Sequence, residues 1–174
     1  MKKIAIIPAR GNSKRLPGKN IKLLYGKPMI AYAIEEAKKS KYVDEVVVTS
    51  DDDEILNISK EYGADVIKRP SELAYDDTPT IEAIRHAVAH MGDDLVVVLL
   101  QPTSPLRTVK DIDKCILLYN AGVFNTVITV REIAPHTFYP NGAVYVFTND
   151  IWTDNMGMVL MGFELYRYRY KDGF

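Results

Sequence analysis

Residues 95–100, LVVVLL, form an unbroken apolar run of strand length. Comparable short runs occur at KKIAIIPA (2–9), DEVVVTS (44–50), ADVIKR (64–69) and TVITV (126–130). Apolar residues at successive positions indicate strands that are buried on both faces, as in parallel sheets covered by helices. The segment NGAVYVF (141–147) predicts another strand, and MVLMGFELYRYRY (158–170) predicts one or two more.

Helical segments separate these strands. They are KPMIAYAIEEAKKSK (27–41), DDDEILNISKEYG (51–63), TPTIEAIRHAVAHMG (78–92) and TVKDIDKCILLYNAG (108–122). Pro28 suits a helix start and Gly63 a helix stop. The alternation predicts an α/β fold with a doubly wound, mostly parallel sheet and helices on both faces, in a single domain over 1–174. Ligands bind at the carboxyl ends of such strands, so loops 8–20, 49–53, 69–80 and 101–108 should open on one edge.

Composition and charge limit the partners and the cellular compartment that can be expected for this protein. The 174 residues carry a formal net charge of -1, which argues against nucleic-acid or membrane-surface partners. Cys115 is the single cysteine, so no internal disulfide can form and a reducing cytoplasm is expected. Neither a secretory leader nor an apolar run of about 20 residues is evident.

The first strand leads into a basic, glycine-containing loop, IPARGNSKRLPGKN (7–20). Gly-rich turns present backbone N–H groups to phosphates, and nearby cations neutralise them. The loop is not a P-loop, because Gly11 is too far from Gly18 for GxxxxGK and Asn20 replaces the Ser or Thr that holds magnesium. A phosphate-binding loop and a solvated basic loop both remain open at this point.

Four motifs together resemble one family. They are IPARGNSKRLPGKN (7–20), RPSELAYDDTPT (69–80), LLQPTSPLR (99–107) and YPNGAVYVF (139–147). Their content and order resemble the cytidylyltransferases that make CMP-activated sialic acids and related keto sugar acids. The resemblance covers roughly residues 1–148. It implies a nucleotide-diphospho-sugar transferase-like fold, and attack of a sugar hydroxyl on the α-phosphate of CTP with release of pyrophosphate, usually with Mg²⁺.

The resemblance also implies roles for individual residues. It places the triphosphate against catalytic candidates Arg10, Lys14 and Lys19. It implies further nucleotide contacts from Ala9, Gly11, Ser13, Asn20, Arg69 and Gln101, with Asn20 reading the cytosine edge. The sugar acid would contact Thr80, Gln101, Asn141 and Tyr145.

Several of these residues have a structural alternative. Arg69 could end a strand in solvent, Gln101 could cap a strand, and Tyr145 could belong to the core. Asp51 could serve the site, or an acid there could simply suit a helix N-terminus.

For His86, His90 and Cys115, the sequence favours a structural role over a metal-binding or catalytic one. His86 and His90 have the four-residue spacing of zinc ligands, but no third ligand is evident and HExxH is absent, which favours a structural role. Cys115 lies among apolar residues and is expected in the core rather than as a nucleophile.

The sequence departs from the family in two places. Relatives carry a longer insert, important for dimer contacts, where this chain has VREIAPHTFYPNG (130–142), and they commonly have a Lys where His136 or Thr137 stands. Relatives also have an Asp-x-Asp pair near the C-terminus that binds magnesium. The last acid here, Asp172, has no acidic partner two residues on. A shortened family member is the simplest interpretation.

The missing acid pair leaves the metal ligands unknown. CTP oxygens and water could hold magnesium, other acids such as Asp51 or Asp76 could take part, or the protein could bind nucleotide with poor turnover. The sugar acceptor is also open. The alternating Tyr and Arg of FELYRYRY (163–170) fit either a homodimer contact or a plain edge strand.

Overall fold

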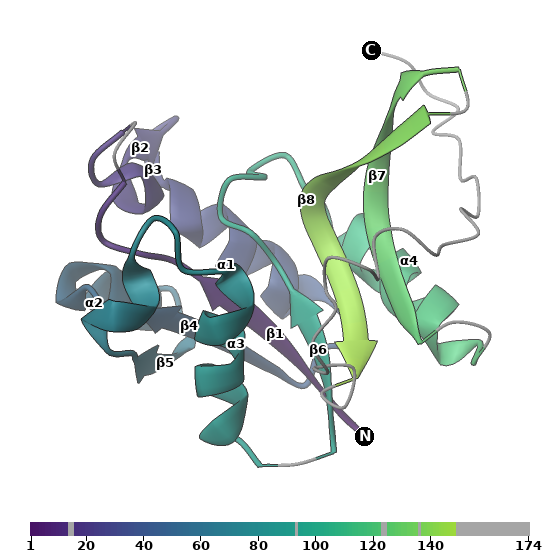
Figure 1. The fold of residues 1–174 in the computed structure, drawn as a ribbon, viewed down its shortest axis with the longest axis horizontal. Helices are drawn as coiled ribbons and strands as arrows, with labels where there is room; N and C mark the ends of the chain where they lie inside the picture. The colour runs from purple at the N-terminus through teal and green to yellow at the C-terminus, as the bar shows by residue number, and fades with distance from the viewer. Residues whose placement is uncertain (14–15, 93, 123–124, 136, 149–174) are drawn as a thin grey trace.

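The computed structural model describes residues 1–13, 16–92, 94–122, 125–135 and 137–148. Lys14, His136, Asp172 and the strands predicted within 158–170 lie outside the described residues. The described residues form a six-stranded sheet with the order β5-β4-β1-β6-β8-β7 (Figure 1). Its strands are β1 (Lys2–Pro8), β4 (Glu45–Ser50), β5 (Asp65–Lys68), β6 (Leu95–Leu99), β7 (Thr126–Ala134) and β8 (Thr137–Thr148).

Four of these strands are parallel neighbours. β1 pairs with β4 on one side and with β6 on the other, and β4 pairs with β5. The chain therefore builds outward from β1 through β4 to β5, then crosses back through α3 (Thr80–Ala89) to place β6 on the other side of β1. This reversal at the carboxyl ends of β1 and β6 is where doubly wound sheets bind ligands.

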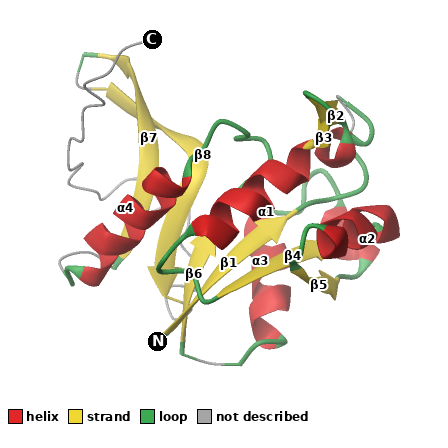
Figure 2. Ribbon diagram, turned by 180° about the vertical axis from the view of Figure 1, so that it is seen from behind, coloured by secondary structure: helices red, strands yellow, loops and turns green. Residues whose placement is uncertain are grey.

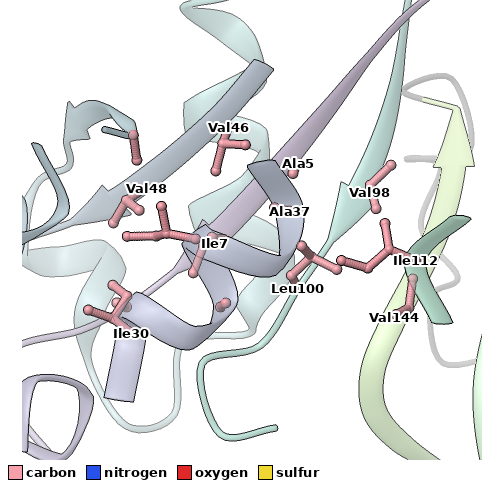
Figure 3. Packing of buried hydrophobic residues seen from close by; sticks show 14 of the residues in the cluster. Ala5, Ile7, Ile30, Ala37, Val46, Val48, Val98, Leu100, Ile112 and Val144 are labelled. Atoms are coloured by element: carbon pink, nitrogen blue, oxygen red, sulfur yellow. The ribbon is translucent and has the colours of Figure 1, made fainter. Parts of the chain in front are cut away.

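Helices cover both faces of the sheet, as predicted. α1 (Met29–Lys39), α2 (Asp53–Glu61) and α4 (Val109–Asn120) cover one face, and α3 covers the other (Figures 1 and 2). Ile7, Val48 and Leu100 of the sheet region pack with Ile30 of α1 and Ile112 of α4 in the larger core (Figure 3). Ile84 and Ala87 of α3 pack on the opposite face. Burial of both sheet faces explains the continuous apolar runs of the strands.

The helix boundaries follow local chemistry. The Asp52 side chain accepts a hydrogen bond from the Ile55 N–H at 3.1 Å and so caps α2. α2 ends as predicted, with Gly63 following in the left-handed conformation at φ 78°. Thr108 and Asp111 form a reciprocal capping box at the start of α4.

The structure contains short elements that the sequence did not predict. The predicted helix start at Pro28 is confirmed, since Pro28 is the N-cap of α1, but the residues before it form a small hairpin of β2 (Leu23–Leu24) and β3 (Lys27–Pro28) that was not predicted. Tyr25 and Gly26 both have positive φ at its turn, which suits a two-residue hairpin loop. Short 3₁₀ helices η1 (Lys19–Ile21) and η2 (Ser71–Ala74) were also not predicted.

The sheet also contains an antiparallel part. β8 lies between β6 and β7 and is antiparallel to both, so the strands predicted at 126–130 and 141–147 form a hairpin that extends one end of the sheet (Figure 1). This agrees with a mostly parallel sheet. It also places the segment after β6 beside the segment around Asn141 and Gly142.

Cys115 provides a test of the core. Its side chain is 5% exposed, and burial raises the pKa of its thiol to about 12. We therefore expect no reaction with a disulfide reagent such as DTNB at pH 8 until the protein unfolds. Because the chain has one cysteine, the coloured product that DTNB releases, at most one equivalent per chain, reports on Cys115 alone. Rapid stoichiometric labelling of the native protein would contradict its place in the core.

Candidate active site

Three of the four predicted loops are directly connected at the carboxyl edge of the sheet. The Gly11 N–H donates to Asp51 Oδ1 at 3.1 Å, which joins the loop after β1 to the loop after β4. Arg10 reaches the loop after β5 by donating from Nη1 to the Tyr75 carbonyl at 3.2 Å. The fourth loop follows β6, whose pairing with β1 brings it to the same edge. The predicted convergence of these loops is confirmed.

The opening loop is held by hydrogen bonds that its backbone makes with the loop after β4 and with the Asn20 side chain. The Ala9 N–H donates to the Thr49 carbonyl at 3.0 Å, so the amides of Ala9 and Gly11 are both engaged within the protein. Asn20 is buried, and its Nδ2 donates to the Arg10 carbonyl at 2.9 Å. Asn20 thus fixes the backbone of the residue whose side chain points toward the next loop. A phosphate would meet the side chains of this loop rather than these two amides.

Arg10 is a partly exposed cation that connects the loop after β1 with the loop after β5. Its Nη2 lies 2.6 Å from Asp76 Oδ1, and its side chain is 33% exposed. A partly exposed guanidinium can exchange a carboxylate partner for a phosphate, because the oxygens of either group can accept two parallel hydrogen bonds from it.

Arg69 is buried, so the interpretation of it as a solvated strand end is wrong. Its side chain is 4% exposed, and Nη1 donates to the Thr49 carbonyl at 2.9 Å. Burial lowers the pKa of Arg69, Asp51 opposes this effect from 3.9 Å, and Arg10 adds to it. Its Nε and the Thr49 hydroxyl are buried without a partner among the described residues. Such orphaned donors beside a functional edge suit a ligand or ordered water.

Thr49 and Tyr145 lie on the α3 face of the sheet. Val47, Ile67 and Leu99 face α3, and side chains in a strand return to the same face every second residue. Thr49 of β4 therefore points to the α3 side, where Tyr145 also packs. Burial raises the pKa of the Tyr145 hydroxyl above its ordinary value. Tyr145 is half-buried and belongs partly to the core and partly to this edge.

His86 of α3 and His90, which follows the end of that helix, have ring centroids 4.5 Å apart and ring planes tilted by 45°. His90 Nδ1 lies 2.7 Å from the His86 carbonyl, and so carries the proton that it donates. Burial lowers the pKa of His86, with further contributions from His90 and Arg69. Across the described ranges, no group of three His, Cys, Asp or Glu side chains could hold a metal.

The YPNGAVYVF segment forms a bulge that meets Gln101. Asn141 Oδ1 accepts hydrogen bonds from the Ala143 N–H at 3.0 Å and from the Thr129 hydroxyl at 2.6 Å. Gly142 is left-handed with φ 76°, and a Cβ there would lie 2.5 Å from Gln101 Oε1. The Gln101 side chain therefore rests on the glycine, which explains why this turn needs a residue without a side chain.

Three other predicted residues lie in the opening loop, in η1 and at the start of α3. Ser13 and Lys19 are half-buried in the opening loop and in η1, and Thr80 is the exposed first residue of α3. Lys14 lies outside the described residues. The roles that the resemblance implies for all these residues stay predictions.

Comparison with known proteins places this edge in a family. A family model described as cytidylyltransferase matches residues 4–153. The chain belongs to the cytidylyltransferase family. The matched range includes all four motifs and all four loops of the edge.

Individual relatives agree with this family. An N-acylneuraminate cytidylyltransferase of Escherichia coli O18:K1:H7 is 45% identical over 116 residues, 67% of this chain and 28% of that protein. A CMP-N,N'-diacetyllegionaminic acid synthase of Legionella pneumophila is 37% identical over 139 residues, 77% of this chain and 60% of that protein. The chain thus spans less than two thirds of the length of these curated relatives.

A solved structure confirms the fold. The structure of CMP:2-keto-3-deoxy-manno-octonic acid synthetase complexed with CTP matches with a TM-score of 0.74 and 19% identity, over 92% of this chain and 82% of that chain. The predicted nucleotide-diphospho-sugar transferase-like fold is therefore correct. Over the described part of the chain, no helix is long and apolar enough to cross a membrane.

Three structural residues of this cytidylyltransferase edge were not selected from the sequence. Gly142 supports Gln101, Asp52 caps α2 beside Gly11, and Arg107 is buried behind the loop after β6. The motifs contain Gly142 and Arg107, but nothing in their residue types reveals long-range contacts. The left-handed turn of Asn141-Gly142 was the one available signal.

Under the function proposed below, we expect Gly142→Ala to impair turnover of the acceptor more than CTP binding. The new Cβ would displace the Gln101 side chain, and the left-handed backbone would cost about 1–2 kcal/mol. Gly122→Ala is a matched control, because Gly122 also has a positive φ, 72°, but no atom lies within 4 Å of the position that its Cβ would take. Thermal melting, CTP calorimetry and turnover of both variants test this. Equal activity of the two variants would contradict a role for the Gln101 contact.

Proposed function

We propose that this protein transfers a cytidylyl group from CTP to the hydroxyl of a sialic-acid-like keto sugar acid, giving a CMP-sugar and pyrophosphate. The observation that carries the proposal is the set of contacts from Arg10, Gly11 and Asn20, which fixes the family's opening motif onto the loops after β4 and β5. The names of the matched relatives supply the class of acceptor.

The reaction is an in-line displacement at phosphorus. The acceptor oxygen forms a bond to the α-phosphorus, the bond from that phosphorus to the bridging oxygen of the β-phosphate breaks, and the hydroxyl proton passes to solvent. Positioning and charge stabilisation carry most of such a reaction. In the proposal, Arg10, Lys14 and Lys19 bind the triphosphate, while Gln101, Thr80, Asn141 and Tyr145 orient the sugar acid.

Asn20 offers a physical basis for the choice of base. Its Nδ2 is held by the Arg10 carbonyl, which orients its other amide atom, Oδ1, as an acceptor. An acceptor suits the exocyclic amine of cytosine and opposes the carbonyl that uracil has at the same place. The same residue would then link recognition of the base to the position of Arg10.

We also propose that turnover depends on Mg²⁺, held largely by triphosphate oxygens and water. The described acids do not form a protein cage: Asp51 accepts from the Gly11 N–H, and Asp76 pairs with Arg10. When bound, the metal would neutralise charge on the transferring phosphate. Chelation with EDTA should abolish pyrophosphate release, and added Mg²⁺ should restore it.

Equilibrium binding of CTP, UTP, ATP and GTP, with and without Mg²⁺, tests the nucleotide part. We expect clear preference for CTP, lost in Asn20→Ala and kept in Asn12→Ala, an exposed neighbour in the same loop. Pyrophosphate release with N-acetylneuraminate or diacetyllegionaminate then tests transfer. CTP binding without release on any acid would favour a nucleotide-binding relative, and release only with other alcohols would favour a different acceptor.

A further inference from the structure

Arg107 is an unusually buried cation at the end of the loop after β6. Its side chain is 5% exposed, and burial lowers its pKa to about 10 against the opposing effects of Asp111 and Glu36. Among the described residues, no carboxylate lies within ion-pair distance of it. Its Nε and Nη2 are buried without a hydrogen-bond partner there. Burying a charge in this way is unfavourable, and an apolar residue would often serve stability equally well.

The contacts that Arg107 does make join two chain segments. Its Nη1 donates to the Gln101 carbonyl at 3.1 Å and to the Ala143 carbonyl at 2.7 Å. One segment is the loop 101–107 after β6, and the other is the bulge of β8. A single guanidinium nitrogen with two hydrogens therefore fixes the spacing between them.

The same two segments meet again through a side chain. Gln101 Oε1 lies against Gly142, so a Cβ at that glycine would stand 2.5 Å away. Thr129 and Asn141 hold the shape of the bulge from the β7 side. Residues 101, 107, 142 and 143 thus form a closed set of contacts in which Arg107 supplies the only charged donor to both backbones among the described residues.

We propose that Arg107 is a positioning residue for the acceptor half of the site, holding the Gln101 loop and the Asn141–Tyr145 segment of β8 in register. It does not touch substrate, and it acts through the residues that would bind the sugar acid. The inference rests on the proposed function for the identity of that substrate. The nucleotide half depends on other contacts, those of Arg10, Gly11 and Asn20.

The separation of the two halves makes the inference testable by kinetics. In Arg107→Met, KM for the sugar acid should rise about tenfold to a hundredfold, as expected for loss of alignment, while KM for CTP stays within about twofold. Arg107→Lys should recover part of the loss, because an ammonium can donate to one or both carbonyls with poorer geometry. Ile116→Val, a buried change on α4, controls for a general loss of stability. Equal changes in both KM values, or none, would overturn the inference.

Amide hydrogen exchange tests the positioning role of Arg107 without requiring any substrate, so it does not depend on the proposed function. In the full chain, Arg107→Met should speed amide exchange in 101–107 and 141–146 and leave β1 and β4 unchanged. If the wild-type protein transfers to neither N-acetylneuraminate nor diacetyllegionaminate, the proposed acceptor fails, and exchange alone decides whether Arg107 positions these segments. Unchanged exchange in both segments, or uniform acceleration across the sheet, would overturn the positioning role.

Discussion

Replacing Arg10 by alanine is expected to lower kcat/KM for CTP by about 10²–10³, the range seen when one donor to a developing phosphate or oxyanion charge is removed. The guanidinium is partly exposed and pairs with Asp76 at 2.6 Å. Its removal leaves acidic groups at the edge without this cation, so the triphosphate would meet repulsion as well as a missing donor. The fold should persist, since partly exposed ion pairs contribute little to stability.

The ion pair with Asp76 suggests a second substitution, one that should not weaken CTP binding. Asp76→Asn removes the carboxylate that competes with phosphate for Arg10, so CTP affinity should stay equal or increase. Lys41→Ala removes an exposed cation elsewhere and should change neither binding nor turnover. Steady-state kinetics and CTP calorimetry on the three variants test this. Turnover of Arg10→Ala near the wild-type value would remove Arg10 from the catalytic candidates.

Local patterns in the sequence predicted most of the sheet and helices, because burial on both faces leaves continuous apolar runs. They could not predict the place of β8, since pairing between β6 and residues about 50 positions later depends on packing rather than propensity. The hairpin at Tyr25 and Gly26 was missed for a different reason. Tyrosine is untypical at a left-handed turn position, and Pro28 indicated a helix start at once.

The sequence predicted the candidate site about as far as it predicted the fold. Motif order brought the right loops to one edge, because parallel strands end together. Sequence alone could not show that Arg69 is buried, that Asn20 holds the Arg10 carbonyl, or that Asn141 Oδ1 is used by its own bulge. These are long-range or conformational facts, and they decide which atoms of each residue remain for a ligand.

Gly11→Ala is the second substitution expected to have a large effect, because the space beside Gly11 is filled by a fixed residue. A Cβ at this position would lie 2.7 Å from the Asp52 Cβ and 2.5 Å from its Oδ2. Asp52 cannot easily move, since it caps α2 through Ile55 and its own N–H donates to the Ser50 hydroxyl at 3.0 Å. The opening loop must therefore shift, and the Gly11 hydrogen bond to Asp51 would be lost.

We expect this shift to weaken CTP binding about tenfold to a hundredfold and to destabilise the fold by about 1–3 kcal/mol through overpacking. The steric cause can be tested by a double-mutant cycle. Asp52→Gly removes the obstructing Cβ at a cost of only a few tenths of a kcal/mol, roughly, at an N-cap position. Adding it to Gly11→Ala should restore most of the CTP affinity, measured by calorimetry beside each single variant. If the double variant binds CTP no better than Gly11→Ala, the contact with Asp52 is not what requires glycine at this position, because only that contact is relieved by the second change.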